Sequence, residues 1–124
     1  MKLNLHNAMW PGIVGKGQGA EEEAISLQRM IELTCNTRVH GQTFDGIDLI
    51  LAAPHLNVSS NQDEIVKFAD TVLSHNLKIG SVVAPIWPSA GGGSAMGFVD
   101  ERKKFIAAVR NTCEYCKILN RHGV

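Results

Sequence analysis

The sequence predicts an α/β fold in which three parallel strands alternate with three helices. Two short apolar runs bounded by turn residues, at 47–53 and 77–84, have the pattern of strands buried on both faces. A shorter run near the N-terminus alternates apolar and polar residues. Each of the three runs is followed, later in the chain, by a segment with the apolar spacing of a helix. Because such alternation builds a parallel sheet with right-handed crossovers, we expect residues 1–124 to form a single domain.

The first strand and helix lie in the N-terminal third of the chain. A strand is predicted at 2–7, where Leu3 and Leu5 alternate with polar residues. A glycine-rich connection follows, and we expect it to lack regular structure. The first helix is predicted at 26–39. Ser26 is its expected N-cap because a serine hydroxyl can accept a hydrogen bond from an unpaired backbone N–H.

The strand at 47–53 is followed by the second predicted helix, at 61–75. Ser60 is its expected N-cap, and Asp63 stands three residues on, where a capping box has its acidic partner. The apolar stripe of this helix has helical spacing and consists of Ile65, Phe68, Ala69, Val72 and Leu73.

The strand at 77–84 runs into a loop rich in proline and glycine, and a third helix is predicted at 101–121. Asp100 is its expected N-cap, and Gly123 is placed where glycine terminates helices. Gly91–Gly93 matches neither glycine-rich phosphate-binding pattern, so we interpret it as a flexible rim loop or lid.

Polar and aromatic residues follow the predicted strand ends. In parallel α/β layers the loops that leave the strands lie on one side, and ligands bind there. The residues that this rule places on one rim, and that we predict to bind substrate, are His6, Asn7, Trp10, His55, Asn57 and Trp87.

Each rim residue also has a structural interpretation. The unperturbed pKa of histidine is close to neutrality, so His55 either polarises or protonates a ligand oxygen or else bonds a neighbouring loop. His6 with Asn7 has the same two interpretations. Asn57 either binds a ligand hydroxyl or makes an Asx turn. Trp10 and Trp87 either form an apolar wall against a ligand or pack internally.

Composition excludes several classes of protein. Lys plus Arg equals Asp plus Glu at 12 each, which argues against a nucleic-acid partner and a polybasic membrane patch. Three cysteines without a secretion signal indicate a cytoplasmic protein. Cys113 and Cys116 have redox spacing, but they lie late in a predicted helix, so we interpret them as core residues.

The motifs at the strand ends resemble a known family. HNAMWPG, FDGIDL, PHLN, and SVVAPIWP followed by GGGSAMG occur at successive strands, and together they are similar to the N-terminal part of xylose-isomerase-like TIM-barrel proteins. That family comprises sugar and sugar-phosphate isomerases and epimerases. The resemblance implies three consecutive βα units of a (β/α)8 barrel, an incomplete barrel of parallel strands. It also implies a role in carbohydrate metabolism with a small sugar as substrate.

The resemblance implies that the isomerase or epimerase reaction requires residues that this chain does not contain. Complete family members use a divalent metal, Mg²⁺ or Mn²⁺, whose ligands and acid/base carboxylates lie on later strands, so no metal ligand is assigned here. We therefore expect a part-barrel that is inactive alone; the alternative is a non-catalytic fragment or a sugar-binding subunit completed by a partner. Unpaired strand edges predict a homo-oligomer, or else a small three-layer α/β sheet.

Overall fold

The computed structural model describes residues 2–10, 13 and 23–124. Its sheet contains β1 (Asn4–His6), β4 (Gly46–Ile50) and β5 (Lys78–Val83). The order is β1-β4-β5 and both pairings are parallel, which confirms the predicted α/β class and the central place of the second predicted strand. Most of the predicted glycine-rich connection, residues 14–22, lies outside the described residues.

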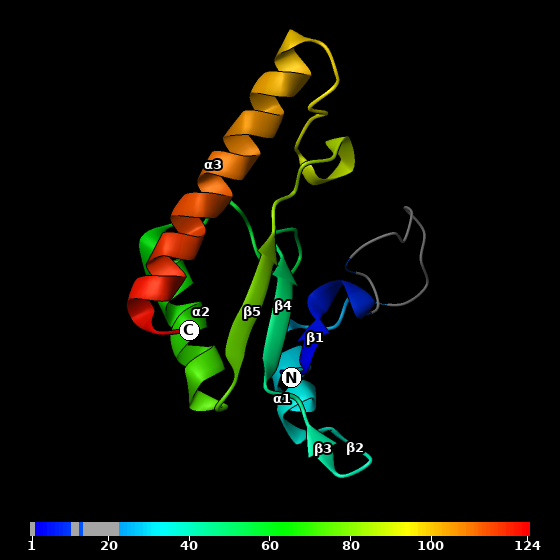
Figure 1. Cartoon of the computed structure of the whole chain (residues 1–124), viewed down its shortest axis with the longest axis vertical. Helices are drawn as coiled ribbons and strands as arrows, with labels where there is room; N and C mark the ends of the chain where they lie inside the picture. The colour runs from blue at the N-terminus through cyan, green and yellow to red at the C-terminus, as the bar shows by residue number, and fades with distance from the viewer. Residues whose placement is uncertain (1, 11–12, 14–22) are drawn as a thin grey trace.

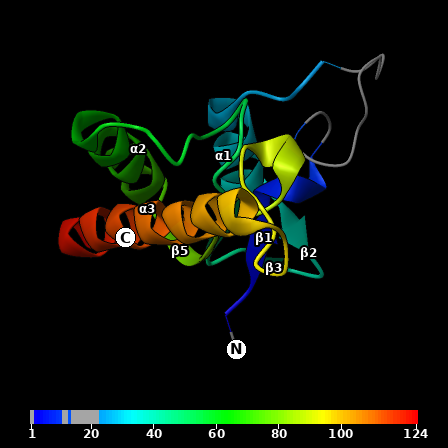
Figure 2. The same ribbon diagram turned by 90° about the horizontal axis from the view of Figure 1, so that it is seen from above.

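Three helices pack on one face of this sheet, as Figures 1 and 2 show. They are α1 (Leu27–Asn36), α2 (Gln62–Ser74) and α3 (Val99–His122). The arrangement therefore has two layers rather than three, and the sheet is open. None of the helices in the described part of the chain combines the length and apolar composition needed to cross a bilayer.

The hydrophobic core lies between the sheet and the helices. Ile47 and Leu49 of β4 are fully buried there, because alternate side chains of a strand point to the same face. Asp48 points to the opposite face, where its Oδ1 accepts a hydrogen bond from Asn4 Nδ2 at 3.1 Å. The residues that α3 buries are Ala108, Thr112, Tyr115 and Leu119.

The predicted N-cap is confirmed at the first helix only, whereas Gly123 is the C-cap of α3 as predicted. Ser26 caps α1 as predicted, and its Oγ accepts a hydrogen bond from Arg29 N. The predicted Ser60 cap of α2 is wrong: Asn61 is the N-cap and forms a capping box with Glu64, the residue type that this motif usually carries. The predicted Asp100 cap is also wrong, because α3 starts earlier, after Phe98, and Asp100 lies in its first turn.

A short antiparallel hairpin occupies the end of the predicted first helix. It pairs β2 (Arg38–Val39) with β3 (Gln42–Thr43). The connecting residues His40 and Gly41 have φ values of 49° and 81°, the conformation that a two-residue hairpin turn requires. The helix therefore ends at Asn36 rather than near residue 39.

The loop after β5 is packed more tightly than the sequence suggests. It contains the short 3-10 helix η2 (Pro88–Ala90). Gly92 and Gly93 are buried, and a Cβ on either would overlap backbone atoms of Ile86 or Glu101. Glycine at these positions permits close backbone packing, which differs from the open, lid-like loop that we predicted.

Candidate ligand pocket at the end of β4

A pocket of about 390 Å³ opens where the chain leaves β4, and we call it the β4-end pocket. Its volume lies within the range of roughly 300–1,000 Å³ that is typical of small-molecule sites. The residues that line it are Leu27, Ala53, Pro54, His55, Leu56, Asn57, Ser60, Glu64, Phe68 and Tyr115. It thus combines a hydrocarbon wall with polar groups from the β4–α2 loop and from α2 and α3.

Local hydrogen bonds hold the β4–α2 loop in this position. Leu56 N donates to the Ala52 carbonyl at 3.2 Å, and the Leu56 side chain is buried in the core. Asn57 Oδ1 accepts from Ser59 N at 2.8 Å, so Asn57 makes the Asx turn that was one of its two interpretations. The remainder of the exposed Asn57 amide stays available at the pocket wall.

His55 is buried at the base of this loop. Its Nε2 lies 2.6 Å from the Ile25 carbonyl oxygen. Because a carbonyl only accepts, the ring proton is on Nε2, and Nδ1 is an unprotonated acceptor. Among the described residues Nδ1 has no hydrogen-bond partner. Burial lowers the pKa of His55, against the opposing effect of the Ile25 hydrogen bond, so the ring is neutral at pH 7.

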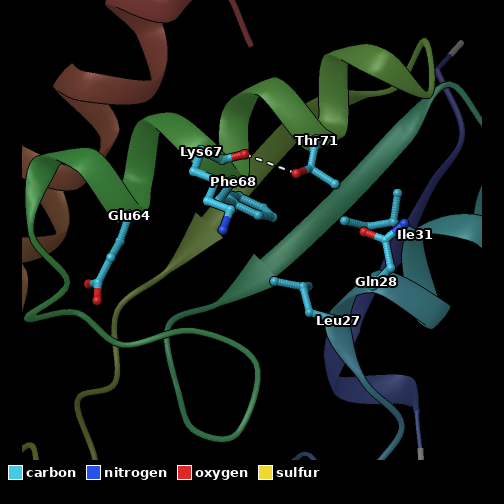
Figure 3. Close-up of a pocket in the computed structure, with 7 residues that line it drawn as sticks. All are labelled: Leu27, Gln28, Ile31, Glu64, Lys67, Phe68 and Thr71. Carbon is cyan, nitrogen blue, oxygen red and sulfur yellow. Dashed lines mark hydrogen bonds between the residues drawn. The ribbon is translucent and has the colours of Figure 1, made fainter.

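Glu64 and Phe68 connect the β4-end pocket to a second hollow between α1 and α2. Figure 3 shows this hollow, where Leu27 and Ile31 of α1 face the Glu64 and Phe68 side of α2. It has a volume of about 320 Å³ and shares Leu27, Glu64 and Phe68 with the β4-end pocket. Glu64 Oε2 accepts from Asn61 N at 3.0 Å, so the capping box fixes this carboxylate at the junction of the two hollows.

Tyr115 brings a phenol to the pocket from α3. Burial raises the pKa of Tyr115 to about 12, with smaller contributions in the same direction from the charges of Glu64 and Cys116. The phenol therefore remains protonated at neutral pH and can donate a hydrogen bond to a ligand oxygen.

Tyr115 is the only tyrosine of the chain, so its ionisation can be followed by phenolate absorbance. We expect the folded protein to titrate with a pKa of about 12, and the denatured chain with the ordinary value of about 10. Because folding raises this pKa, ionisation of Tyr115 disfavours the folded state. The contribution of the protonated phenol to the free energy of unfolding is fully present below pH ~10 and is lost as pH rises towards 12. A folded-state titration at the denatured-chain value would contradict the buried position.

The predicted residues at the end of β1 have structural partners. Asn7 is fully buried; its Oδ1 accepts from Ile50 N at 2.8 Å and its Nδ2 donates to the Ile50 carbonyl at 3.1 Å. Asn7 thereby continues the pairing of β4 beyond the end of β1. His6 Nδ1 accepts from Ala8 N at 3.0 Å and caps the short helix η1 (Asn7–Met9). Their role in substrate binding stays a prediction.

The two tryptophans lie apart from the β4-end pocket. Trp10 packs against the hydrophobic core, and its indole Nε1 is buried without a partner among the described residues. Trp87 precedes η2, and its carbonyl accepts from Ala90 N and Gly92 N, both at 3.0 Å. The structure therefore brings together His55 and Asn57 of the six predicted residues, and their neighbours are Ser60, Glu64 and Tyr115.

Sequence reasoning missed Glu64 and Tyr115. The capping-box spacing Asn61–Glu64 could have located the first. Tyr115 lies in the C-terminal half of α3, between Cys113 and Cys116, and the spacing of those cysteines gives no indication that the tyrosine faces a pocket. In the part of the chain that the structure describes, no three His, Cys, Asp or Glu side chains are grouped as metal ligands. The divalent metal that the resemblance implies stays an expectation, and we derive no step through it.

The fold and the pocket define the class: a mixed α/β protein with an open three-stranded parallel sheet and a pocket of small-molecule size at the end of its central strand. In comparisons with known proteins, no family model, no curated protein and no solved structure matches the chain.

Proposed function

We propose that the chain binds a sugar or sugar phosphate in the β4-end pocket, as a unit of the isomerase and epimerase kind. The observation that supports this most directly is the composition of the pocket wall. Phe68, Leu27 and the Tyr115 ring offer hydrocarbon to the carbon face of a sugar, and Asn57, Ser60 and Glu64 offer polar groups to its hydroxyls. An apolar wall with a few placed polar groups is the usual design of a small-molecule site.

The sheet supports the finer proposal that these are three consecutive units of a (β/α)8 barrel. The strands are adjacent in the order of the sequence, and the helices cover one face. The other face carries polar side chains, among them the hydrogen-bonded pair Asn4 and Asp48. In a barrel that face would point inward. The proposal assigns binding to this chain, and it leaves the isomerisation chemistry to the later strands that the resemblance implies.

Binding can be tested with two probes, a neutral ketohexose and the same sugar with a terminal phosphate, each titrated into the purified chain. Amide NMR and calorimetry would give the binding curve and its location. We expect saturable binding that shifts the resonances of Asn57, Ser60 and Glu64. Absence of saturation with both probes would refute the proposal. If binding occurs, the probe with the higher affinity would show whether the ligand is a neutral sugar or a sugar phosphate.

A matched pair of variants tests the location. Glu64→Gln retains a side chain that can complete the capping box, and it removes the carboxylate from the pocket wall. We expect a loss of about tenfold in affinity, the effect of one charge-assisted hydrogen bond. Asp63→Asn removes the same charge from the neighbouring residue of α2, which does not line the pocket, and should leave affinity unchanged. Equal losses in both variants would indicate a general electrostatic effect.

A further inference from the structure

A further hollow lies along α3 next to the β4-end pocket. It has a volume of about 180 Å³, and we call it the Lys104 hollow. Figures 1 and 2 show the N-terminal half of α3 beside the loop after β5, where this hollow opens. The residues that line it belong to the β4–α2 loop, the loop after β5 and α3, and they are Val58, Ser59, Pro85, Ala90, Gly91, Lys104, Ala107, Ala108 and Asn111.

The β4–α2 loop and one face of α3 border both spaces. Asn57 and Ser60 line the β4-end pocket, and the two residues between them line the Lys104 hollow. On α3, Lys104 and Asn111 line the hollow and Tyr115 lines the pocket, at spacings that belong to one helix face. At 1.5 Å per residue, Asn111 lies about 6 Å from Tyr115 along the helix axis. The two spaces are therefore close enough for one ligand to occupy both.

The polar groups of the Lys104 hollow suit an anion. Among the described residues that line it, Lys104 is the one ionisable side chain, and Ser59 and Asn111 add a hydroxyl and an amide. All three residues are exposed, so a ligand can reach them from solvent. Ser59 offers its hydroxyl rather than its N–H, because the N–H already donates to Asn57 Oδ1 at 2.8 Å. A lysine ammonium with neighbouring hydrogen-bond donors is a common phosphate-binding arrangement.

The acidic residues nearest to Lys104 along the helix have other contacts. Asp100 pairs with Lys103, with 3.6 Å between Oδ1 and Nζ. The Glu101 carboxylate lies against Gly97, where an added Cβ would overlap it. In the part of the chain that the structure describes, no carboxylate lies within ion-pair distance of Lys104. The Lys104 charge is therefore available to a ligand.

From these contacts we propose that the Lys104 hollow binds a phosphoryl group. A water molecule takes up roughly 30 Å³ in the liquid, so the hollow has room for the oxygens of one phosphate. The ligand that joins this group to the β4-end pocket is a sugar phosphate, an identification that rests on the proposed function. Charge fixes its direction, because the Glu64 carboxylate in the β4-end pocket repels an anion and Lys104 attracts one.

Two neighbouring lysines of α3 test this site as a matched pair. In the natural chain, we expect a ketohexose with a terminal phosphate to bind about tenfold more tightly than the neutral ketohexose, the effect of one charge-assisted contact. Lys104→Met keeps a long side chain without the ammonium, and it should remove this preference. Lys103→Met removes the same charge from a residue that does not line the hollow, and the preference should remain.

Inorganic phosphate tests the hollow without a sugar. We expect it to shift the amide resonances of Ser59 and Asn111 in a saturable manner at millimolar concentration. Asn111→Asp places a carboxylate in the hollow with little change in side-chain size, and it should abolish both these shifts and the preference for the phosphorylated sugar. Circular dichroism spectra and unfolding midpoints that match the natural chain would show that the variants fold.

The outcomes separate this inference from the proposed function. Equal affinities of the natural chain for the two sugars would overturn the phosphoryl site while sugar binding stands, and so would a preference that persists in Lys104→Met or falls equally in Lys103→Met. Saturable shifts with inorganic phosphate that Lys104→Met abolishes, without binding of either sugar, would support the site and refute the proposed function. Absence of any response to all three probes would overturn both.

Discussion

Replacing Asn7 with alanine is expected to lower the free energy of unfolding by about 2–5 kcal/mol. The Asn7 side chain is fully buried and satisfies both the N–H and the carbonyl of Ile50, which lie in the central strand. Alanine would leave these two backbone groups without partners, and each buried unsatisfied group costs about 1–3 kcal/mol. Chemical denaturation with an unchanged denaturant slope would measure the loss.

Two comparisons make the Asn7 result specific. Asn57→Ala removes another asparagine whose side chain bonds the backbone, but its turn is exposed, so we expect a loss below about 1 kcal/mol. Asn7→Asp keeps an acceptor for Ile50 N and places a second oxygen against the Ile50 carbonyl, so it should also destabilise. A loss at Asn7 no greater than that at Asn57 would show that β1 and β4 do not depend on this bridge.

Replacing Leu49 with alanine is expected to cost about 2–5 kcal/mol, through lost burial and the cavity that remains. Leu49 has no exposed surface and lies in the hydrophobic core at the centre of β4. Because β1 and β5 flank this strand, neighbouring backbone has little freedom to close the gap.

The control for Leu49 is Val39→Ala on the hairpin. The Val39 side chain is exposed, and surface substitutions of this kind change stability by about 0.5 kcal/mol or less. Thermal unfolding followed by circular dichroism would rank the two variants. If Leu49→Ala were as mild as Val39→Ala, β4 would not be the centre of the core.

Patterns close together in the sequence predicted most of the fold. The alternation of Leu3 and Leu5 and the apolar run of β4 identified strands, because side-chain burial on one or both faces leaves a direct periodicity. Ser26 was recognised as a cap because its partner, Arg29 N, is three residues away. At α2 two polar residues compete for the same role, and Asn61 rather than Ser60 is the cap because Glu64 completes its capping box.

The features that the sequence patterns did not predict depend on contacts between residues far apart in the chain. Asn7 and Ile50 are 43 residues apart, and His55 and Ile25 are 30 apart, so neither hydrogen bond leaves a local signal. Tyr115 reaches the β4-end pocket only because α3 packs beside α2. For the same reason, the six predicted rim residues do not share a single pocket: His55 and Asn57 line the β4-end pocket, and Trp10 packs against the core.

The sequence by itself determined an α/β chain with three parallel strands, a buried central strand, and polar residues where that strand ends. These features follow from hydrophobic periodicity and turn chemistry, which act over a few residues. Only the tertiary structure decided that the helices share one face of the sheet, and that Glu64 and Tyr115 join His55 around a pocket. The physical reason is that burial, pocket shape and helix packing depend on residues that meet only when the chain has folded.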